Sequence, residues 1–289
     1  MDIAKDIREF LMTRRARIKP AEVSLPSGPR RRVPGLRREE VAQLAGVSTE
    51  YYTQIERGNV TGVSDEVLHA VARALQLTDD ETVHFFDLAR AAITTRGATR
   101  IKRGSGQTIP DGLQALIDSM TTSPAIVMNG SLDILAANPL GRALYAPVFD
   151  RATGTPNLAR FIFFDTFSEE AFPQWKRMAD EAVALLQAEA ARSPHSAGIT
   201  QIVGELATRS EEFRTRWAAH NVTAHRHGAK QFRHAEFGEL TLTYNVLAVV
   251  AAPGLSVVGY TAEPGSPSAE ALRILASWCA ADVQTTARD

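Results

Sequence analysis

Apolar residues recur at helical spacing through the first third of the chain. Ile3, Ile7, Phe10 and Leu11 lie on one face of a first predicted helix, which makes that helix amphipathic. Ser64 as an N-cap and the capping box Thr78-Asp79-Asp80-Glu81 mark the starts of two further short helices. Five helices are predicted, beginning near residues 3, 38, 49, 65 and 79.

A tight turn joins the second and third of these helices. The segment 38–45 places Val41, Leu44 and Ala45 on one face, and Gly46 follows where a left-handed residue must reverse the chain. This pattern predicts a helix-turn-helix, a motif that places its second helix in a groove of DNA. An ordinary corner between two helices of a bundle is the alternative.

The third helix separates an apolar face from a polar one. Ser48 suits its N-cap, and Tyr52 and Ile55 are expected to point inward. Side chains able to read base edges are expected to point outward, namely those of Thr49, Glu50, Thr53 and Gln54.

Charge is divided unevenly along the chain. Residues 1–107 carry a formal charge of +4 and the remainder carries −5. Residues 14–38 hold nine Lys and Arg against one acid, Glu22, with several Pro and Gly among them. This density of positive charge is typical of a segment that binds a polyanion, and the segment is predicted to be an extended basic arm. The alternative is a positively charged face exposed to solvent.

The second half of the chain changes to a strand pattern. Asn129-Gly130 separates two apolar runs, as in a hairpin. Leu240, Leu242, Tyr244 and Val246 alternate with polar residues, which predicts a strand with one buried face. Another strand is expected over 255–262.

Helices are predicted between and after these strands. They cover 157–163 and 168–191, a segment capped by Ser210, and a terminal helix opened by Ser266 or Ser268. Two strands, a helical insert and three more strands predict an α+β domain with a five-stranded antiparallel sheet.

Composition and length indicate two domains. A Gly-, Ser- and Arg-rich segment over 93–109 has the composition of a linker, which predicts a helical domain over 1–92 and a second domain over 110–289. One cysteine, Cys279, allows no intramolecular disulfide, and no apolar run is long enough for a signal core or a membrane helix. A cytoplasmic protein is expected.

Long ordered motifs extend over nearly the whole chain. They include RRVPGLRREEVAQLAGVSTEYYTQIERG, NLARFIF, PQWKRMADEAVALL, VGELATRSEEFRTRWAAH, GAKQFRHAEFGELTL and YTAEPGSPSAEALRIL. With these motifs the chain resembles the MmyB-like family of bacterial transcription regulators. The resemblance implies an N-terminal all-α lambda-repressor-like helix-turn-helix domain and a C-terminal PAS-like domain associated with a fatty-acid-like ligand.

Similarity to lambda-repressor-like domains implies how the helix-turn-helix would meet DNA. Base edges are expected to meet Ser48, Thr49, Glu50 and Gln54, with Thr53 close by. Phosphates are expected to meet Arg37, Arg38, Arg57 and the hydroxyl of Tyr51. The arm residues Arg30, Arg31 and Arg32 would follow the backbone or enter a narrow minor groove, unless they act only as nonspecific counter-charge. A homodimer on two half-sites is expected.

Apolar side chains of the second domain are candidates to line a ligand cavity, although any single one of them is more often plain core than ligand wall. They are Met128, Leu135, Phe161, Phe164, Phe172, Trp175, Trp217, Leu242, Tyr244 and Val246. Cations that could meet a ligand carboxylate are Arg160, Arg214, His227, Lys230 and Arg233, with surface salt bridging as the alternative.

Two other functions are weaker hypotheses. One is an enzyme with a metal site at His225 and His227, but the neighbouring Arg and Lys side chains would oppose a cation. The sequence also contains no nucleophile elbow and no phosphate-binding loop. Neither a metal, a cofactor nor a catalytic residue is therefore expected. The other is a DNA-binding dimer whose C-terminal domain is packed solid. Native mass spectrometry of gently purified protein separates that possibility from a ligand sensor.

Overall fold

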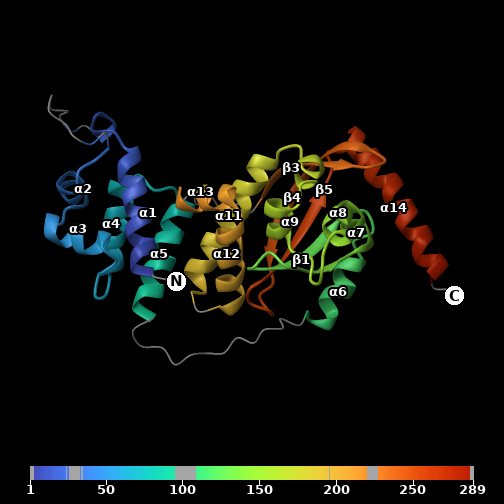
Figure 1. Cartoon of the computed structure of the whole chain (residues 1–289), viewed down its shortest axis with the longest axis horizontal. Helices are drawn as coiled ribbons and strands as arrows, with labels where there is room; N and C mark the ends of the chain where they lie inside the picture. The colour runs from blue at the N-terminus through green and yellow to red at the C-terminus, as the bar shows by residue number, and fades with distance from the viewer. Residues whose placement is uncertain are drawn as a thin grey trace. The chain divides into compact units, whose positions relative to one another are not determined.

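The computed structural model describes residues 3–23, 25, 33, 35–94, 109–194, 196–219 and 227–286. The chain divides into two compact units, one with the N-terminal helices and one with a β-sheet (Figure 1). The predicted arm residues Arg30, Arg31 and Arg32 lie outside the described residues, as does most of the predicted linker 93–109. The domain limits 1–92 and 110–289 stay a prediction.

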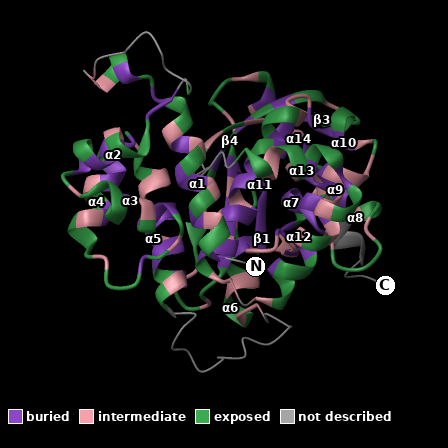
Figure 2. Ribbon diagram, turned by 60° about the vertical axis from the view of Figure 1, so that its left-hand side comes forward, coloured by how far each residue is buried: buried purple, intermediate pink, exposed green. Residues whose placement is uncertain are grey.

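Five α-helices and one short 3-10 helix form the N-terminal part of the first unit, which also contains residues 187–200 and part of the segment 215–224. Their bounds are α1 Ile3–Arg17, η1 Pro20–Val23, α2 Arg38–Ala45, α3 Thr49–Glu56, α4 Asp65–Ala74 and α5 Asp79–Thr94. The capping box predicted for α5 is present, because Thr78 Oγ1 accepts from the Glu81 amide at 3.3 Å and Glu81 Oε2 accepts from the Thr78 amide at 3.1 Å. Figure 2 shows that these helices carry both buried and exposed residues, as amphipathic packing requires.

The predicted inward faces form the core of this unit, with one exception. Ile7, Phe10, Leu11, Val41 and Ile55 are fully buried. Leu44 was expected beside Val41, but it is 38% exposed. On this short helix the buried stripe runs through Val41, Ala42 and Ala45, which leaves Leu44 at its edge.

A five-stranded antiparallel sheet forms the second unit, as predicted. The strands are β1 Ala125–Asn129, β2 Ile134–Ala137, β3 His227–His234, β4 Gly238–Ala248 and β5 Leu255–Thr261, in the order β2-β1-β5-β4-β3. The β1–β2 hairpin was expected at Asn129-Gly130, and there Asn129 Oδ1 accepts from the amides of Ser131 and Asp133. The long β4 alternates as expected, with Leu240, Leu242 and Tyr244 buried.

Helices cover both faces of this sheet. They are α6 Asp111–Asp118, α7 Pro139–Leu144, α8 Ala146–Asp150, α9 Leu158–Phe164, α10 Ser168–Ala171, α11 Trp175–Arg192, α12 Ala197–Arg209, α13 Glu211–Ala218 and α14 Pro267–Thr286. Ile117 of α6 packs with Val127 and Val257 on one face, together with Leu135. Tyr145 and Phe172 contact Phe232 on the other face.

The helical insert differs from the sequence prediction in two places. The single helix expected over 168–191 is broken into α10 and α11 at Phe172 and Pro173, because a proline within a helix removes a hydrogen-bond donor and clashes with the preceding turn. The second difference is that helices α7, α8 and α12 were not predicted. The N-cap expected at Ser210 is present, since its Oγ accepts from the Phe213 amide at 3.1 Å.

Candidate DNA interface and ligand-binding region

Helices α2 and α3 form the predicted turn. Gly46 adopts φ 68°, its N–H donates to the Gln43 carbonyl at 3.2 Å, and the N–H of Val47 donates to the Ala42 carbonyl at 3.0 Å, which ends α2. A side chain at this φ would be strained, so glycine fits the position. Ser48 then caps α3, its Oγ accepting from the Tyr51 amide at 3.0 Å.

One side of α3 is fixed by the core. Tyr52 and Ile55 are fully buried, as predicted. After them Gly58 turns at φ 84°, and a Cβ there would collide with the backbone of Ala4 in α1. The end of α3 therefore lies directly against α1, which fixes the direction in which the opposite side of α3 points.

The opposite side of α3 carries the residues expected to meet DNA. Thr53 is half-buried and its hydroxyl donates to the Thr49 carbonyl at 2.7 Å. The other predicted contacts of this region are exposed, namely Arg37, Arg38, Ser48, Thr49, Glu50, Tyr51, Gln54 and Arg57. A polar, exposed helix face that starts at a capped N-terminus is the geometry of a groove-reading helix.

Gln54 is held by a residue that the sequence did not single out. Asn59 Nδ2 donates to Gln54 Oε1 at 2.8 Å. This bond leaves the Gln54 Nε2 group as donor toward a base, while the oxygen keeps one lone pair for a second contact. Asn59 lies in the turn after α3, where polar residues are common. Nothing at this position of the sequence therefore indicated that it would bond Gln54.

Glu56 is the second residue that the sequence analysis missed. Its side chain is 1% exposed and accepts from Arg15 Nε of α1 at 2.9 Å and from Arg38 Nε of α2 at 2.7 Å. One carboxylate therefore ties α3 to both of the helices beside it. Arg38 remains 42% exposed, so its other nitrogens can still face a phosphate.

The N-terminus of α2 carries its own cations. Glu40 Oε2 accepts from the Arg37 amide at 2.6 Å, and Arg37 Nη1 lies 3.2 Å from Glu39 Oε1. Arg37 is therefore placed beside the positive end of the helix dipole, where a phosphate is favoured.

The extended arm predicted for 14–38 is wrong at its start. Arg14, Arg15 and Arg17 belong to α1, and Arg14 Nε pairs with Glu81 at 2.8 Å inside the first unit. Burial lowers the pKa of Arg14 to about 10. In the described part of the chain, five of the nine cations of this segment therefore have acid partners, namely Arg14, Arg15, Arg17, Arg37 and Arg38. The spacing of Arg14 and Arg15 in α1 is what turns these two toward the core.

Several residues predicted to line a ligand site come together on one face of the sheet. Phe161 packs edge-on against Phe172 with ring centroids 5.8 Å apart, and Tyr244 lies 6.3 Å from Tyr260. Met128 and Leu242 are buried, and Val246 is half-buried opposite Val258.

The remaining predicted lining residues lie apart from this group. Leu135 packs with the α6 cluster on the other face of the sheet. Trp175 donates from Nε1 to the Ile162 carbonyl, Phe164 lies under the Arg209 guanidinium at 4.1 Å, and Trp217 is half-buried in α13.

Lys230 is the cation that faces the aromatic interior. Its Nζ lies 3.4 Å from Glu181 Oε2 and 4.5 Å from the centre of the Tyr244 ring. Burial lowers the pKa of Lys230, although Glu181 opposes that shift, and burial raises the pKa of Tyr244 to about 12. The Tyr244 hydroxyl is buried and has no hydrogen-bond partner among the described residues.

The other candidate cations lie elsewhere. Arg214 is exposed and donates to the Ala207 carbonyl, His227 is exposed, and Arg233 pairs with Glu239 at 2.7 Å on the surface. Arg160 bonds Glu205 at 2.9 Å. Of the five candidate cations, Lys230 is therefore the one that lies beside the buried aromatic rings.

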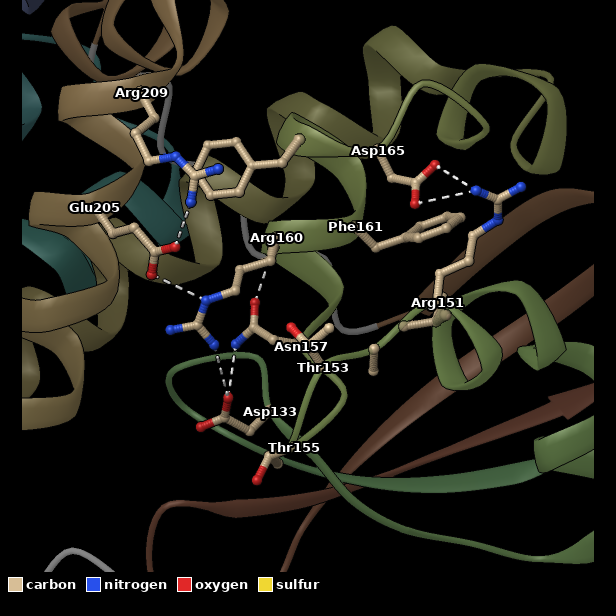
Figure 3. Close-up of a pocket in the computed structure, with 13 residues that line it drawn as sticks. Asp133, Arg151, Thr153, Thr155, Asn157, Arg160, Phe161, Asp165, Glu205 and Arg209 are labelled. Atoms are coloured by element: carbon tan, nitrogen blue, oxygen red, sulfur yellow. Dashed lines mark hydrogen bonds and ion pairs between the residues drawn. The ribbon is translucent and has the colours of Figure 1, made fainter.

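A polar cavity of about 580 Å³ lies in the second unit (Figure 3). The loop between α8 and α9 lines it, together with α9, α12 and the turn after β1. Three residues predicted to meet a ligand, Arg160, Phe161 and Phe164, are on its wall.

Among the described residues, no group of three His, Cys, Asp or Glu side chains is arranged to hold a metal ion. His225, half of the considered histidine pair, lies outside them. Nor does any helix of the described chain have the length and apolar character needed to cross a bilayer.

Comparison with protein families agrees with this two-part geometry. Residues 109–275 match the MmyB-like transcription regulator ligand binding domain, and residues 11–85 match a helix-turn-helix domain. A comparison with curated proteins finds no match. The first of these matches covers more than half of the chain and contains the sheet and the helices around it, while the second contains the capped helix and its turn. The chain therefore belongs to the MmyB-like transcription regulators.

Proposed function

We propose that this chain is a sequence-specific DNA-binding regulator that acts as a homodimer in the bacterial cytoplasm and senses a small hydrophobic, fatty-acid-like ligand. The observation that carries the DNA-binding part is the exposed polar side of α3, presented by a helix whose other side is locked into the core. In this proposal Thr49, Glu50 and Gln54 read base edges, while Arg37, Arg38 and Arg57 hold phosphates.

The ligand part of the proposal rests on two polar groups inside the aromatic interior, the Lys230 ammonium and the Tyr244 hydroxyl. An acyl chain gains about 0.8 kcal/mol for each buried methylene. Contacts of the acyl chain with Phe161, Phe172 and Tyr244 would therefore supply most of the binding free energy. Its carboxylate needs donors, and Lys230 together with the unpartnered Tyr244 hydroxyl supplies them.

A second candidate is a regulator whose C-terminal domain binds no acyl chain. Close ring packing favours it, since Phe232 lies edge-on to Tyr145, Phe172 and Tyr260 at 5.4 to 5.8 Å and fills the space between the sheet and the helices. An acyl chain would have to displace these rings.

Native mass spectrometry tests the two candidates. The full chain is purified gently, and a portion is extracted with solvent and then exposed to palmitate. The ligand proposal expects a copurifying lipid mass that is lost on extraction and restored by palmitate in the wild type, with weaker restoration in Lys230→Met. If every sample shows only the mass of the protein without lipid, the result supports a C-terminal domain that binds no acyl chain.

A further inference from the structure

Ionised side chains line the polar cavity, and their hydrogen-bonding groups are not used evenly. Three arginines line it with three acids, so its formal charge is balanced: Arg151, Arg160 and Arg209 face Asp133, Asp165 and Glu205. Balanced charge does not mean balanced hydrogen bonding, because a guanidinium has five N–H donors and a carboxylate accepts about four hydrogen bonds through its two oxygens.

The acids are already occupied by the protein. Glu205 accepts from Arg160 Nε at 2.9 Å through one oxygen and from Arg209 Nη1 at 3.0 Å through the other. The two oxygens of Asp133 accept from the side-chain amides of Asn157 at 2.7 Å and Asn129 at 2.9 Å. Both carboxylates thus have a protein donor on each oxygen.

The arginines are far less occupied. Arg160 Nη1 lies 3.9 Å from Asp133, too far for a hydrogen bond. Arg151 Nη1 reaches the Asp165 oxygens only at 3.4 and 3.5 Å, well beyond the usual length of a charge-assisted bond. Among the described residues, the hydrogen bonds of each of these guanidinium groups use one nitrogen.

The rest of the wall suits a small polar molecule. Thr153 and Thr155 are exposed in the loop that leads from Arg151 to α9, and both line the cavity, as Figure 3 shows. Phe164 stacks beneath Arg209 at 4.1 Å and fixes the plane of that guanidinium. The volume of about 580 Å³ lies within the range of small-molecule sites.

We propose that this cavity binds a small oxyanion, a carboxylate- or phosphate-bearing metabolite, through Arg151, Arg160 and Arg209. The oxyanion accepts from guanidinium nitrogens that the protein leaves without an acceptor and takes the place of Asp165 as the close partner of Arg151. This site contains neither Lys230 nor Tyr244, although Phe161 lies on its wall and also among the rings proposed to contact an acyl chain. The oxyanion proposal does not depend on an acyl ligand or on DNA binding.

Isothermal titration of the full chain with citrate and, separately, with glycerol 3-phosphate tests the proposal at constant ionic strength. We expect saturable binding at one site for at least one probe, weakened about tenfold or more in both Arg151→Gln and Arg209→Gln, since each loses a charge-assisted bond. Arg273→Gln is the matched control, because Arg273 is an exposed arginine paired with Glu270 on α14, outside the cavity. Its binding should equal that of the wild type.

The two probes identify the source of the oxyanion. Binding of citrate alone indicates a carboxylate, and binding of glycerol 3-phosphate alone indicates a phosphorylated compound. If Arg209→Gln fails to fold, as circular dichroism would show, Arg151→Gln decides, since Arg151 makes only long bonds to Asp165. Absence of saturable binding for both probes, or full binding in the folded arginine variants, overturns the proposal.

Discussion

Tyr244 and Tyr260 lie opposite each other on neighbouring strands and are equally buried, but only one hydroxyl is satisfied. Tyr260 and Tyr145 share a hydrogen bond of 2.5 Å, whereas the Tyr244 hydroxyl has no partner among the described residues. An unsatisfied buried hydroxyl costs about 1 to 3 kcal/mol.

We therefore expect opposite effects from the same substitution in the ligand-free protein. Tyr244→Phe should raise the free energy of unfolding by about 1 kcal/mol, and Tyr260→Phe should lower it by a similar amount. Urea denaturation monitored by circular dichroism measures both. A loss of stability in Tyr244→Phe as large as that in Tyr260→Phe would mean that the hydroxyl has a partner, such as water.

Gln54 and Arg38 should differ in how they affect DNA binding. Gln54→Ala is expected to cost about 1 to 3 kcal/mol at one base position only, while Arg38→Ala should weaken all sequences alike and reduce the salt slope by about one charge. Affinities for a selected operator and its single-base variants, taken at several salt concentrations, separate the two. Equal losses on every sequence for Gln54→Ala would remove it from the base-reading group.

The buried Lys230 makes stability depend on pH. Its folded pKa lies below the ordinary value of 10.5, so between these two values the unfolded chain binds more protons, and the free energy of unfolding rises as pH increases through that window. Tyr244, with its pKa raised to about 12, has the opposite effect once pH exceeds about 10.

The Lys230 contribution is expected below that limit. Urea denaturation at increasing pH, up to about 10, should show a rise in stability for the wild type and a flatter profile for Lys230→Met. Identical slopes for the two proteins would show that the ammonium is not desolvated. Arg233→Met, at an exposed cation on the same strand, is the control and should keep the wild-type slope.

Among the elements, three helices depend on one carboxylate. Glu56→Gln removes the negative charge that Arg15 and Arg38 share and should lower the free energy of unfolding by about 3 kcal/mol, the usual cost of breaking a buried pair. Glu66→Gln, on the exposed side of α4, should change it by less than about 0.5 kcal/mol. Thermal unfolding compares them, and similar melting temperatures for both variants would contradict the role given to Glu56.

Local chemistry explains which elements could be predicted. The caps at Ser48, Ser64 and Thr78 and the left-handed Gly46 are signals within a few residues of one another, and all four are present. Pro173 was equally visible, but the apolar spacing on both sides of it suggested one continuous helix. Because proline has no backbone N–H to donate, the helix breaks there into α10 and α11.

The arrangement of charges could not be read from the sequence. Glu56 meets Arg15 across 41 positions, and Arg160 meets Glu205 across 45. Such pairs depend on how helices pack, whereas spacing along the chain reports only on neighbours in the same element. For this reason the sequence left five possible head-group cations, and in the structure Lys230 is the one of them that faces the aromatic interior.

For the whole molecule, the predicted homodimer sets a rule for operator geometry. Two helix-turn-helix units on one face of DNA require half-sites about 34 Å apart or a multiple of that distance. Inserting about 5 base pairs between the half-sites turns one of them to the opposite face, so gel-shift affinity should fall, and inserting a full turn of about 10 should restore part of it. Unchanged affinity across the insertions would indicate a monomer that reads one half-site.

The bond between Asn59 and Gln54 has a consequence for how regulators of this kind diverge. Asn59 lies in the turn after α3 and orients the side-chain amide of Gln54, which we propose contacts a base. A substitution at position 59 would free that amide to rotate and exchange its donor for its acceptor, so that a different base is preferred. Target choice could thus drift in a lineage while every residue at the nucleic acid surface stays the same.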